Sequence, residues 1–314
     1  METVLITGGT GMIGTAITKA LLEKNYKVII LTRDRARFGA SVPNLSYAEW
    51  NIDEQTIDVS AVAKADYVIH LAGAGVGDKR WTAKRKREIL ESRTRSGNLL
   101  VKTLAENKNN VRAIISASGI GWYGTASPDG NGTGALPFTE ADPAADDFLG
   151  STCKEWEASI DAVTSLGKRL VKFRAGIVLS NKGGALQEFK KPLRFGIATI
   201  LGNGKQLMSW VHIDDLVRLY IFAVENDKLQ GVYNAVAPQI VTNKKFILHL
   251  AKAVRGRFFV PVFIPTFVLE IVVGELSIEV LKSAAVSCER IKQEGYAFLY
   301  PSVKSAVTQL AKSD

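Results

Sequence analysis

The sequence contains few of the residues that build metal sites or disulfide frameworks. Its 314 residues include two cysteines, Cys153 and Cys288, and three histidines that lie far apart. Two cysteines allow one disulfide at most, and a structural zinc site takes about four closely spaced Cys or His ligands. We therefore predict no metal site.

Long apolar runs and a secretory leader are also missing. The longest apolar stretch, residues 258–269, is interrupted by Pro261 and Pro265 and ends at Glu270. It is shorter than the roughly 20 residues that span a bilayer. We expect a buried helix or an oligomer contact there and no membrane association. The chain enters an apolar run almost at once, with no charged region before it, so we expect a cytoplasmic protein.

The composition is that of a folded soluble protein. Lys and Arg number 40 against 31 Asp and Glu, which gives a net charge of +9, and 46% of the residues are hydrophobic. These values exclude collagen-like, coiled-coil and disordered chains. The length suits one large α/β domain, or a main domain with a smaller lobe.

Short β-rich runs alternate with helical patterns in the first half of the chain. The apolar runs cover residues 4–7, 28–32, 67–71, 112–116 and 170–173, and the helical patterns cover 13–24, 59–65, 83–106 and 148–166. Continuous apolar runs are typical of parallel strands buried on both faces. Their alternation with helices predicts an α/β fold with a doubly wound parallel sheet of the Rossmann type.

The alternation weakens after Arg174, although a strand at 209–213 and a helix at 216–224 are still indicated. We predict a nucleotide-binding domain over 1–232, with 175–207 contributing partly to the substrate lobe, and a smaller C-terminal α+β substrate lobe over 233–314. The unpatterned stretch 126–145 is expected to be a long functional loop.

A glycine loop follows the first strand and opens the first helix. Gly8, Gly11 and Gly14 are spaced by three residues. This spacing permits a tight turn and lets backbone amides approach a pyrophosphate, while the helix N-terminus adds partial positive charge. The motif predicts a dinucleotide site formed by Gly8, Thr10, Gly11, Met12, Ile13 and Gly14.

The residues after the second strand choose between the two nicotinamide cofactors. A carboxylate there binds the ribose 2′-hydroxyl of NAD, whereas arginine accepts the 2′-phosphate of NADP. Arg33 comes first, and Arg35 and Arg37 reinforce it. We therefore predict NADP, although Asp34 would favour NAD if it faced the ribose, and an exposed arginine need not bind anything.

Several segments together resemble the extended short-chain dehydrogenase/reductase superfamily. They are the glycine loop, His70-Leu71-Ala72-Gly73, Ser116-Ala117-Ser118 with Tyr123, and the segment from Trp210 to Asp215. Further segments, including 73–77, 118–124 and 234–238, resemble its NAD(P)-binding epimerase-family members, which have a distinctive C-terminal domain. The resemblance implies that Leu71, Ala72 and Gly73 line the cofactor.

The same resemblance implies a catalytic Tyr, a Lys four residues later that lowers its pKa, and a Ser that binds the reacting oxygen. Ser118 fits the serine role. The helix after the long loop contains no tyrosine, and pairing with Lys154 places Gly150 at the tyrosine position.

Tyr123 is therefore the candidate proton donor with Ser118, although it is equally compatible with packing beneath the cofactor. Tyr300 and Lys304 have the required spacing but lie outside the strand-to-helix context. Cys153, Lys154 and Glu157 remain candidates, or form a solvated helix face.

A basic segment follows His70-Leu71-Ala72-Gly73 and contains Lys79, Arg80, residues 84–87, Arg93 and Arg95. It accompanies core-like leucines on a predicted helix and no nucleic-acid-binding signature, so we expect no nucleic-acid partner. An anionic cofactor or a phosphorylated small-molecule substrate nearby explains it better.

The sequence thus predicts an NADP-dependent oxidoreductase or epimerase-like protein that transfers a hydride on a carbonyl or nucleotide-sugar-like substrate. The alternative is an NADP(H)-binding sensor or regulatory protein without turnover. The sequence does not decide whether the chain forms a homodimer.

Overall fold

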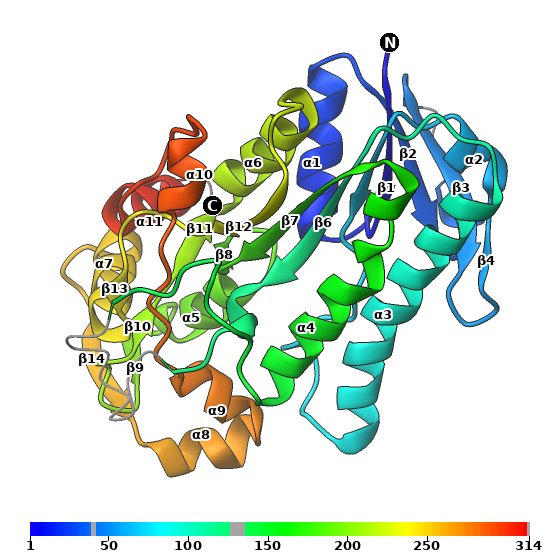
Figure 1. Cartoon of the computed structure of the whole chain (residues 1–314). Helices are drawn as coiled ribbons and strands as arrows, with labels where there is room; N and C mark the ends of the chain where they lie inside the picture. The colour runs from blue at the N-terminus through cyan, green and yellow to red at the C-terminus, as the bar shows by residue number, and fades with distance from the viewer. Residues whose placement is uncertain (39–41, 126–135, 313–314) are drawn as a thin grey trace.

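Figure 1 shows the computed structural model of the chain, which describes residues 1–38, 42–125 and 136–312. An eight-stranded sheet forms its centre. The strand order is β12 (Gly231–Ala235), β7 (Arg169–Ala175), β6 (Ala113–Gly119), β5 (Tyr67–His70), β1 (Thr3–Thr7), β2 (Lys27–Thr32), β3 (Leu45–Asn51) and β4 (Thr56–Ile57). Neighbouring strands pair in parallel, except that β4 is antiparallel to β3.

Helices cover both faces of the sheet. On one face lie α1 (Met12–Glu23) and α6 (Ile213–Glu225), and on the other lie α2 (Val59–Ala63), α3 (Ala83–Glu106) and α4 (Phe148–Asp161) (Figure 1). Strand β1 shows why the strands of this sheet are continuous apolar runs in the sequence. Val4 and Ile6 join the core beneath α1 and α6, whereas Leu5 joins the core beneath α2, α3 and α4. The predicted doubly wound α/β fold is confirmed.

The smaller lobe has a core of its own. Its elements are β8 (Ile177–Leu179), α5 (Ala185–Leu193), β9 (Ile197–Leu201), β10 (Leu207–Met208), β11 (Trp210–His212), β13 (Val241–Thr242), α7 (Asn243–Arg255), β14 (Val260–Ile264), α8 (Thr266–Val273), α9 (Leu276–Leu281) and α11 (Val303–Lys312). Between the last two, α10 (Glu289–Gln293) places Ile291 in the core beneath α1 and α6. Trp210, Phe246 and Val307 are fully buried in this core. The lobe lies beside the β12 end of the sheet (Figure 1).

Three features of the fold differ from or add to the sequence analysis. Strand β3 was not predicted, and it extends the sheet beyond β2. The boundary predicted between residues 232 and 233 lies inside β12, which pairs with β7 in the main sheet. The buried helix expected at 258–269 is wrong, because β14 occupies part of that segment and its first four residues are exposed.

No helix in the described part of the chain is long and apolar enough to span a bilayer.

Candidate functional site

The glycine loop lies at the carboxyl end of β1 and leads into α1 (Figure 1). Two of its glycines leave no room for a side chain. A Cβ at Gly8 would lie 3.0 Å from the Leu71 carbonyl carbon, and one at Gly14 would lie 2.3 Å from the Gly8 carbonyl oxygen. At Gly11 a Cβ would meet only that same oxygen, at 3.4 Å. The loop is therefore open at Gly11, where a pyrophosphate has to approach the backbone.

The start of α1 adds favourable electrostatics to this opening. Gly11 is the N-cap, and Thr10 and Gly11 are exposed. Amides in a first helical turn lack acceptors within the helix, and the helix dipole makes that end positive. The first turn contains no acidic side chain. The predicted residues Thr10, Gly11, Met12 and Ile13 thus form a loop that fits the pyrophosphate of a dinucleotide.

Thr7 fixes the end of β5 beside the glycine loop. Its Oγ1 accepts hydrogen bonds from the amides of Leu71 and Ala72, at 3.1 and 3.2 Å. The Thr7 proton is therefore directed to His70 Nδ1, 2.8 Å away. Burial lowers the pKa of His70 to about 4, so the ring is neutral at pH 7. The two strand ends that carry the predicted cofactor-lining residues are thus tied together.

Arg33 follows β2, and its side chain is exposed. The carboxylate of Asp34 is paired with Arg37, whose Nε lies 3.2 Å from Asp34 Oδ2. Within the described ranges, the side chains of Arg33 and Arg35 make no hydrogen bond or ion pair. Two guanidinium groups at this strand end therefore face solvent, while the neighbouring carboxylate is engaged.

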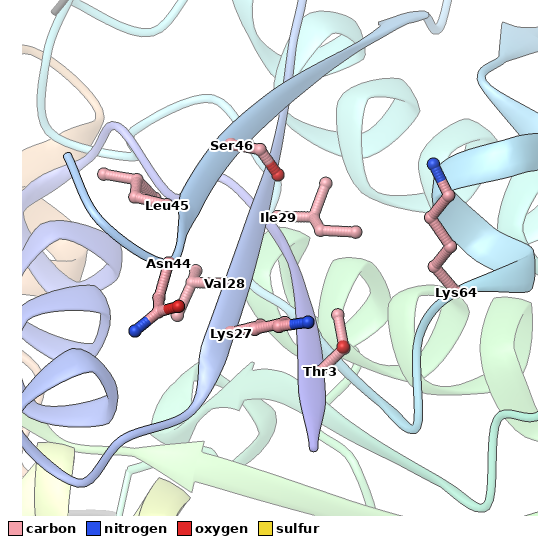
Figure 2. A pocket seen from close by; sticks show the side chains of 8 residues that line it. All are labelled: Thr3, Lys27, Val28, Ile29, Asn44, Leu45, Ser46 and Lys64. Carbon is pink, nitrogen blue, oxygen red and sulfur yellow. The ribbon is translucent and has the colours of Figure 1, made fainter. Parts of the chain in front are cut away.

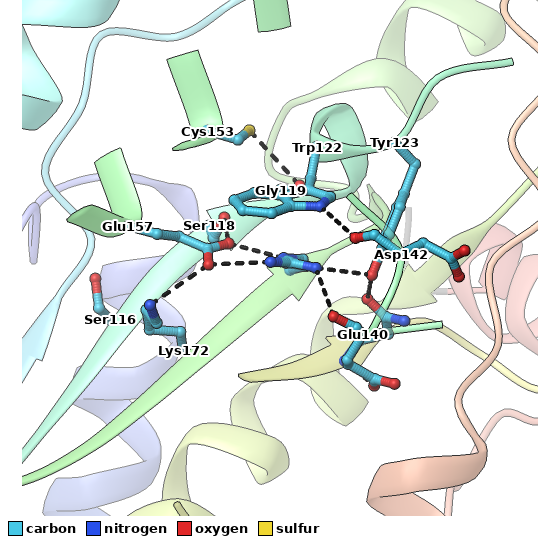
Figure 3. Close-up of polar contacts among 12 residues, drawn as sticks. Ser116, Ser118, Gly119, Trp122, Tyr123, Glu140, Asp142, Cys153, Glu157 and Lys172 are labelled. Atoms are coloured by element: carbon cyan, nitrogen blue, oxygen red, sulfur yellow. Dashed lines mark hydrogen bonds and ion pairs between the residues drawn. The ribbon is translucent and has the colours of Figure 1, made fainter. Parts of the chain in front are cut away.

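Ser118, at the carboxyl end of β6, donates its hydroxyl proton to Glu157 Oε1 of α4 at 2.7 Å (Figure 3). Arg174 of β7 binds the same carboxylate with two nitrogens, Nε to Oε1 at 2.8 Å and Nη2 to Oε2 at 3.1 Å. Lys172 Nζ lies 3.5 Å from Glu157 Oε2 and 2.7 Å from Asp161 Oδ1. Ser118, Glu157 and Arg174 are buried. The paired charges and hydrogen bonds offset the cost of burying the carboxylate.

Tyr123 is fully buried, and its hydroxyl has partners on both sides. The hydroxyl donates to Asn234 Oδ1 at 2.7 Å and accepts from Arg174 Nη1 at 3.1 Å (Figure 3). Its ring stacks on Phe138, with the centroids 5.1 Å apart. Burial raises the pKa of Tyr123 to about 12. As placed here, Tyr123 directs its proton into the buried network, and a proton-donor role would require the hydroxyl to leave Asn234.

The face of α4 that packs near Ser118 carries Cys153 and Glu157. The Cys153 thiol lies 3.6 Å from the backbone carbonyl of the residue after Ser118, and burial raises its pKa to about 11. Lys154 is exposed instead. A Cβ at Gly150 would lie 2.1 Å from a backbone oxygen, so no side chain fits there. Cys153 and Glu157, four residues apart, therefore stand where the resemblance places tyrosine and lysine.

Two arginines of the basic segment are buried and hold the loop after β5. Arg85 Nη2 donates to the Gly75 carbonyl at 2.5 Å, and Arg93 Nη1 donates to the Ala74 carbonyl at 3.0 Å. A Cβ at Gly73 would lie 3.0 Å from the Arg93 guanidinium. These two charges support the loop that carries the predicted cofactor residue Gly73.

The pair Tyr300 and Lys304 lies in the smaller lobe. The Tyr300 amide donates to Asp215 Oδ2 at 2.9 Å, and its ring packs on His212 with the centroids 3.9 Å apart. Lys304 is exposed on α11. These contacts tie the C-terminal segment to α6 and involve none of the residues around Ser118.

Sequence reasoning missed Arg174, Lys172, Asn234 and Thr7 as members of the site. A signal for the first two was present, because Lys172 and Arg174 alternate along a strand that is otherwise apolar. Charged residues in such a strand are almost always paired when buried. Asn234 also donates its backbone N–H to Glu140 Oε1, at 2.7 Å, and so links the network to the described part of the long loop. The predicted loop itself lies partly outside the described residues.

An open hollow of about 440 Å³ lies at the opposite edge of the sheet (Figure 2). It is lined by residues at the start of β1, β2 and β3, with Lys64 on one side. Ligands of doubly wound sheets bind at the carboxyl ends of the strands, so this hollow is not the candidate site. Within the described ranges, no group of three or more His, Cys, Asp or Glu side chains is arranged to hold a metal ion.

Comparison with known protein families gives two matches. The NAD dependent epimerase/dehydratase family matches residues 4–144 and 188–235. A domain of unknown function, DUF1731, matches residues 264–310, which run from the end of β14 through α8, α9 and α10 into α11. An epimerase family protein of Staphylococcus saprophyticus, SSP1921, is 33% identical over 99% of both chains. SAOUHSC_00792, the epimerase family protein of Staphylococcus aureus, is 32% identical over 99% of this chain and all of its own.

Solved structures agree with these matches. The human epimerase family protein SDR39U1 (isoform 2), solved with NADPH, has a TM-score of 0.84 at 28% identity and covers 99% of both chains. UDP-N-acetylglucosamine 4-epimerase of Bacillus cereus has a TM-score of 0.75 at 18% identity, covering all of this chain and 99% of its own, and shares the fold. On the family match and the full-length relatives, the chain belongs to the NAD-dependent epimerase/dehydratase family, with a C-terminal DUF1731 domain.

Proposed function

We propose that the chain binds NADPH in preference to NADH and uses it for hydride transfer on a carbonyl or nucleotide-sugar-like substrate. The preference for NADPH over NADH is inferred from the charged side chains that follow β2. Arg33 and Arg35 are exposed and unpaired within the described ranges, and the carboxylate between them in sequence, Asp34, is engaged by Arg37. Guanidinium groups bind a 2′-phosphate through charge-assisted hydrogen bonds, whereas a 2′-hydroxyl needs an acceptor such as a carboxylate.

Two further observations support the binding of NADPH. The loop at Gly11 has the opening and the helix N-terminus that a pyrophosphate requires. The human relative at 28% identity was solved with NADPH. When bound, this cofactor supplies a hydride to a carbonyl carbon, and the protein has to supply or remove one proton at the oxygen.

We assign the transfer of this proton to Ser118 and Glu157. The Ser118 hydroxyl lies at the carboxyl end of β6, the edge of the sheet that also carries the glycine loop. In alcohol oxidation, the substrate proton passes to Ser118 Oγ while the Ser118 proton passes to Glu157. In carbonyl reduction both transfers run in reverse, and Glu157 must first take up the proton from solvent. Arg174 stabilises the carboxylate form of Glu157. On its other side Arg174 donates to the Tyr123 hydroxyl, which Asn234 holds in turn.

One observation favours the alternative, an NADPH-binding sensor. The α4 positions that face Ser118 carry Cys153 and Glu157 in place of a tyrosine and a lysine. The thiol of Cys153 has a raised pKa and is therefore a weak acid in its buried setting. A protein that has lost its proton-transfer pair while keeping its nucleotide loop is expected to bind cofactor without turnover.

Calorimetry with NADPH and NADH tests the cofactor. We expect NADPH to bind at least tenfold more tightly, and Arg33→Ala to remove most of this preference while leaving NADH affinity unchanged. Arg257→Ala, an exposed arginine in the smaller lobe, is the matched control. Equal affinities for the two cofactors, or a preference that survives Arg33→Ala, contradict the assignment.

NADPH oxidation with a panel of carbonyl compounds and nucleotide sugars separates the enzyme from the sensor. For an accepted substrate, Ser118→Ala should lower kcat/KM by about a hundredfold and leave NADPH affinity unchanged, because the hydroxyl acts on the substrate oxygen. Absence of turnover across the panel, with NADPH binding intact, supports the sensor.

A further inference from the structure

Large apolar side chains that face solvent are concentrated in the smaller lobe. Phe195 is 84% exposed and Phe258 is 83% exposed. Most of the others lie on β9, β14, α8 and α9, namely Ile197, Val260, Val262, Phe263, Phe267, Ile271, Val272, Ile278 and Val280. We call the eleven residues together the apolar corner. Large apolar side chains exposed in this number on neighbouring elements are unusual in a soluble protein unless another surface covers them.

The apolar corner is built from neighbouring elements. Strands β9 and β14 pair in parallel, with Ile197 opposite Val260, and the Val260 amide donates to the Gly196 carbonyl at 2.8 Å. This pairing brings the turns that carry Phe195 and Phe258 to the same end of the two strands. The chain then passes from β14 directly into α8 and α9, at the outer edge of the molecule (Figure 1).

Positive charge is concentrated around β9 and β14 of the same lobe. The acidic residues beside α8 and α9 include Glu275 and Glu279, which pair with Lys86 and Lys282, and Glu270. Residues 189–213 and 228–269 contain ten Lys and Arg and none of the 31 acidic residues. Removing these ten from the total of 40 leaves 30 basic against 31 acidic residues, so the rest of the chain is nearly neutral. Nine of the ten side chains are exposed, and Lys190 is the buried one.

Positive charge flanks the two exposed phenylalanines directly. Arg194 precedes Phe195, and Arg257 precedes Phe258, with Arg255 two residues earlier. All three arginines are exposed, and no ion pair to another described residue neutralises them. An aromatic side chain next to unpaired arginines suits a partner that is both apolar and negatively charged.

We propose that the apolar corner docks on the surface of a bilayer that contains anionic lipids. Its aromatic and aliphatic side chains enter the interfacial region, while the surrounding Lys and Arg side chains contact the headgroups. A second copy of the chain fits less well, because the same face would bring two positively charged lobes together. Interfacial docking needs no spanning helix. The proposal departs from the sequence-based expectation of no membrane contact, which rested on the length of one segment.

Vesicle flotation with the full chain tests the proposal. We expect binding to vesicles of phosphatidylcholine mixed with phosphatidylglycerol, little binding to phosphatidylcholine alone, and weaker binding at high salt. Arg255→Gln with Arg257→Gln should weaken partitioning about thirtyfold. Phe195→Ser with Phe258→Ser should also weaken it and should leave the thermal unfolding temperature unchanged, since both rings face solvent.

The matched control is Lys102→Gln with Lys108→Gln, which removes two exposed charges from the other side of the sheet and should leave partitioning unchanged. Equal binding to both kinds of vesicle overturns the headgroup contact. Absence of binding to either overturns the proposal. If sedimentation then shows a dimer that Phe195→Ser with Phe258→Ser dissociates, a second copy covers this surface.

Discussion

Arg174 holds the carboxylate of Glu157 with two nearly parallel hydrogen bonds, at 2.8 and 3.1 Å, and both side chains are almost completely buried. The pair joins β7 to α4 and also fixes the hydroxyl of Ser118, which bonds to the same carboxylate. A buried ion pair of this kind contributes little net stability as a whole, but removing one partner leaves the other charge without compensation. The pair is therefore a sensitive place to perturb both the fold and the site.

Glu157→Gln should lower the free energy of unfolding by about 3 to 5 kcal/mol, because the Arg174 charge stays buried without its carboxylate. Urea denaturation measures the effect. Asp161→Asn is the control: it removes another carboxylate of α4 that binds Lys172, but that side chain is half-exposed and should cost less than about 1 kcal/mol. Equal losses for the two variants contradict the ion-pair argument.

Tyr123→Phe separates a positioning residue from a proton donor. The change leaves Asn234 Oδ1 without its donor and removes one acceptor from Arg174, so stability should fall by about 1 to 3 kcal/mol. Turnover of an accepted substrate, and its pH profile, should be largely retained at temperatures where the variant is folded. Tyr47→Phe controls for loss of a tyrosine hydroxyl. Loss of turnover without loss of stability would identify Tyr123 as the proton donor.

Gly11→Val and Gly14→Ala should fail in different ways. At Gly11 the backbone φ is −79° and the space is open, so valine should leave a folded protein that binds NADPH at least a hundredfold more weakly. At Gly14 a methyl group meets the Gly8 carbonyl oxygen at 2.3 Å, so alanine should lower the unfolding temperature itself. Fluorescence titration and thermal unfolding, measured on both variants, distinguish the two glycines.

Most strands of the main sheet were predictable because they are buried on both faces and therefore read as unbroken apolar runs. The strands that were missed carry polar residues for physical reasons. In β3, Ser46 and Glu49 are exposed near the edge of the sheet and interrupt the pattern. In β12, Asn234 is fully buried and bonds to Tyr123, so a functional side chain replaces an apolar one.

The part of the candidate site that depends on backbone conformation was predictable from the sequence. The part that depends on which side chains of a helix face the site was not. The glycine loop needs particular φ angles and close approaches that only glycine satisfies, so its spacing identifies it. Which residues of α4 face Ser118 depends on how the helix is rotated on the sheet. Counting four residues back from Lys154 gave Gly150, whereas the packing brings Cys153 and Glu157, which have the same spacing, to Ser118.

His70 makes stability depend on pH. Its folded-state pKa is about 4 against 6.5 for an unperturbed histidine, so the unfolded chain binds the additional proton first as the pH falls. Stability from this group is fully present above pH 6.5 and is lost between pH 6.5 and 4, amounting to about 2 kcal/mol from pH 7.5 to 5. Protonation would also place a positive charge beside the Thr7 hydroxyl, which donates to the neutral ring. Urea unfolding at pH 7.5 and 5 should show this loss in the native protein and a smaller one in His70→Gln. Because His249 is only partly buried, His249→Gln should keep most of the pH dependence, and a His70→Gln variant with an unchanged slope would show that other groups set it.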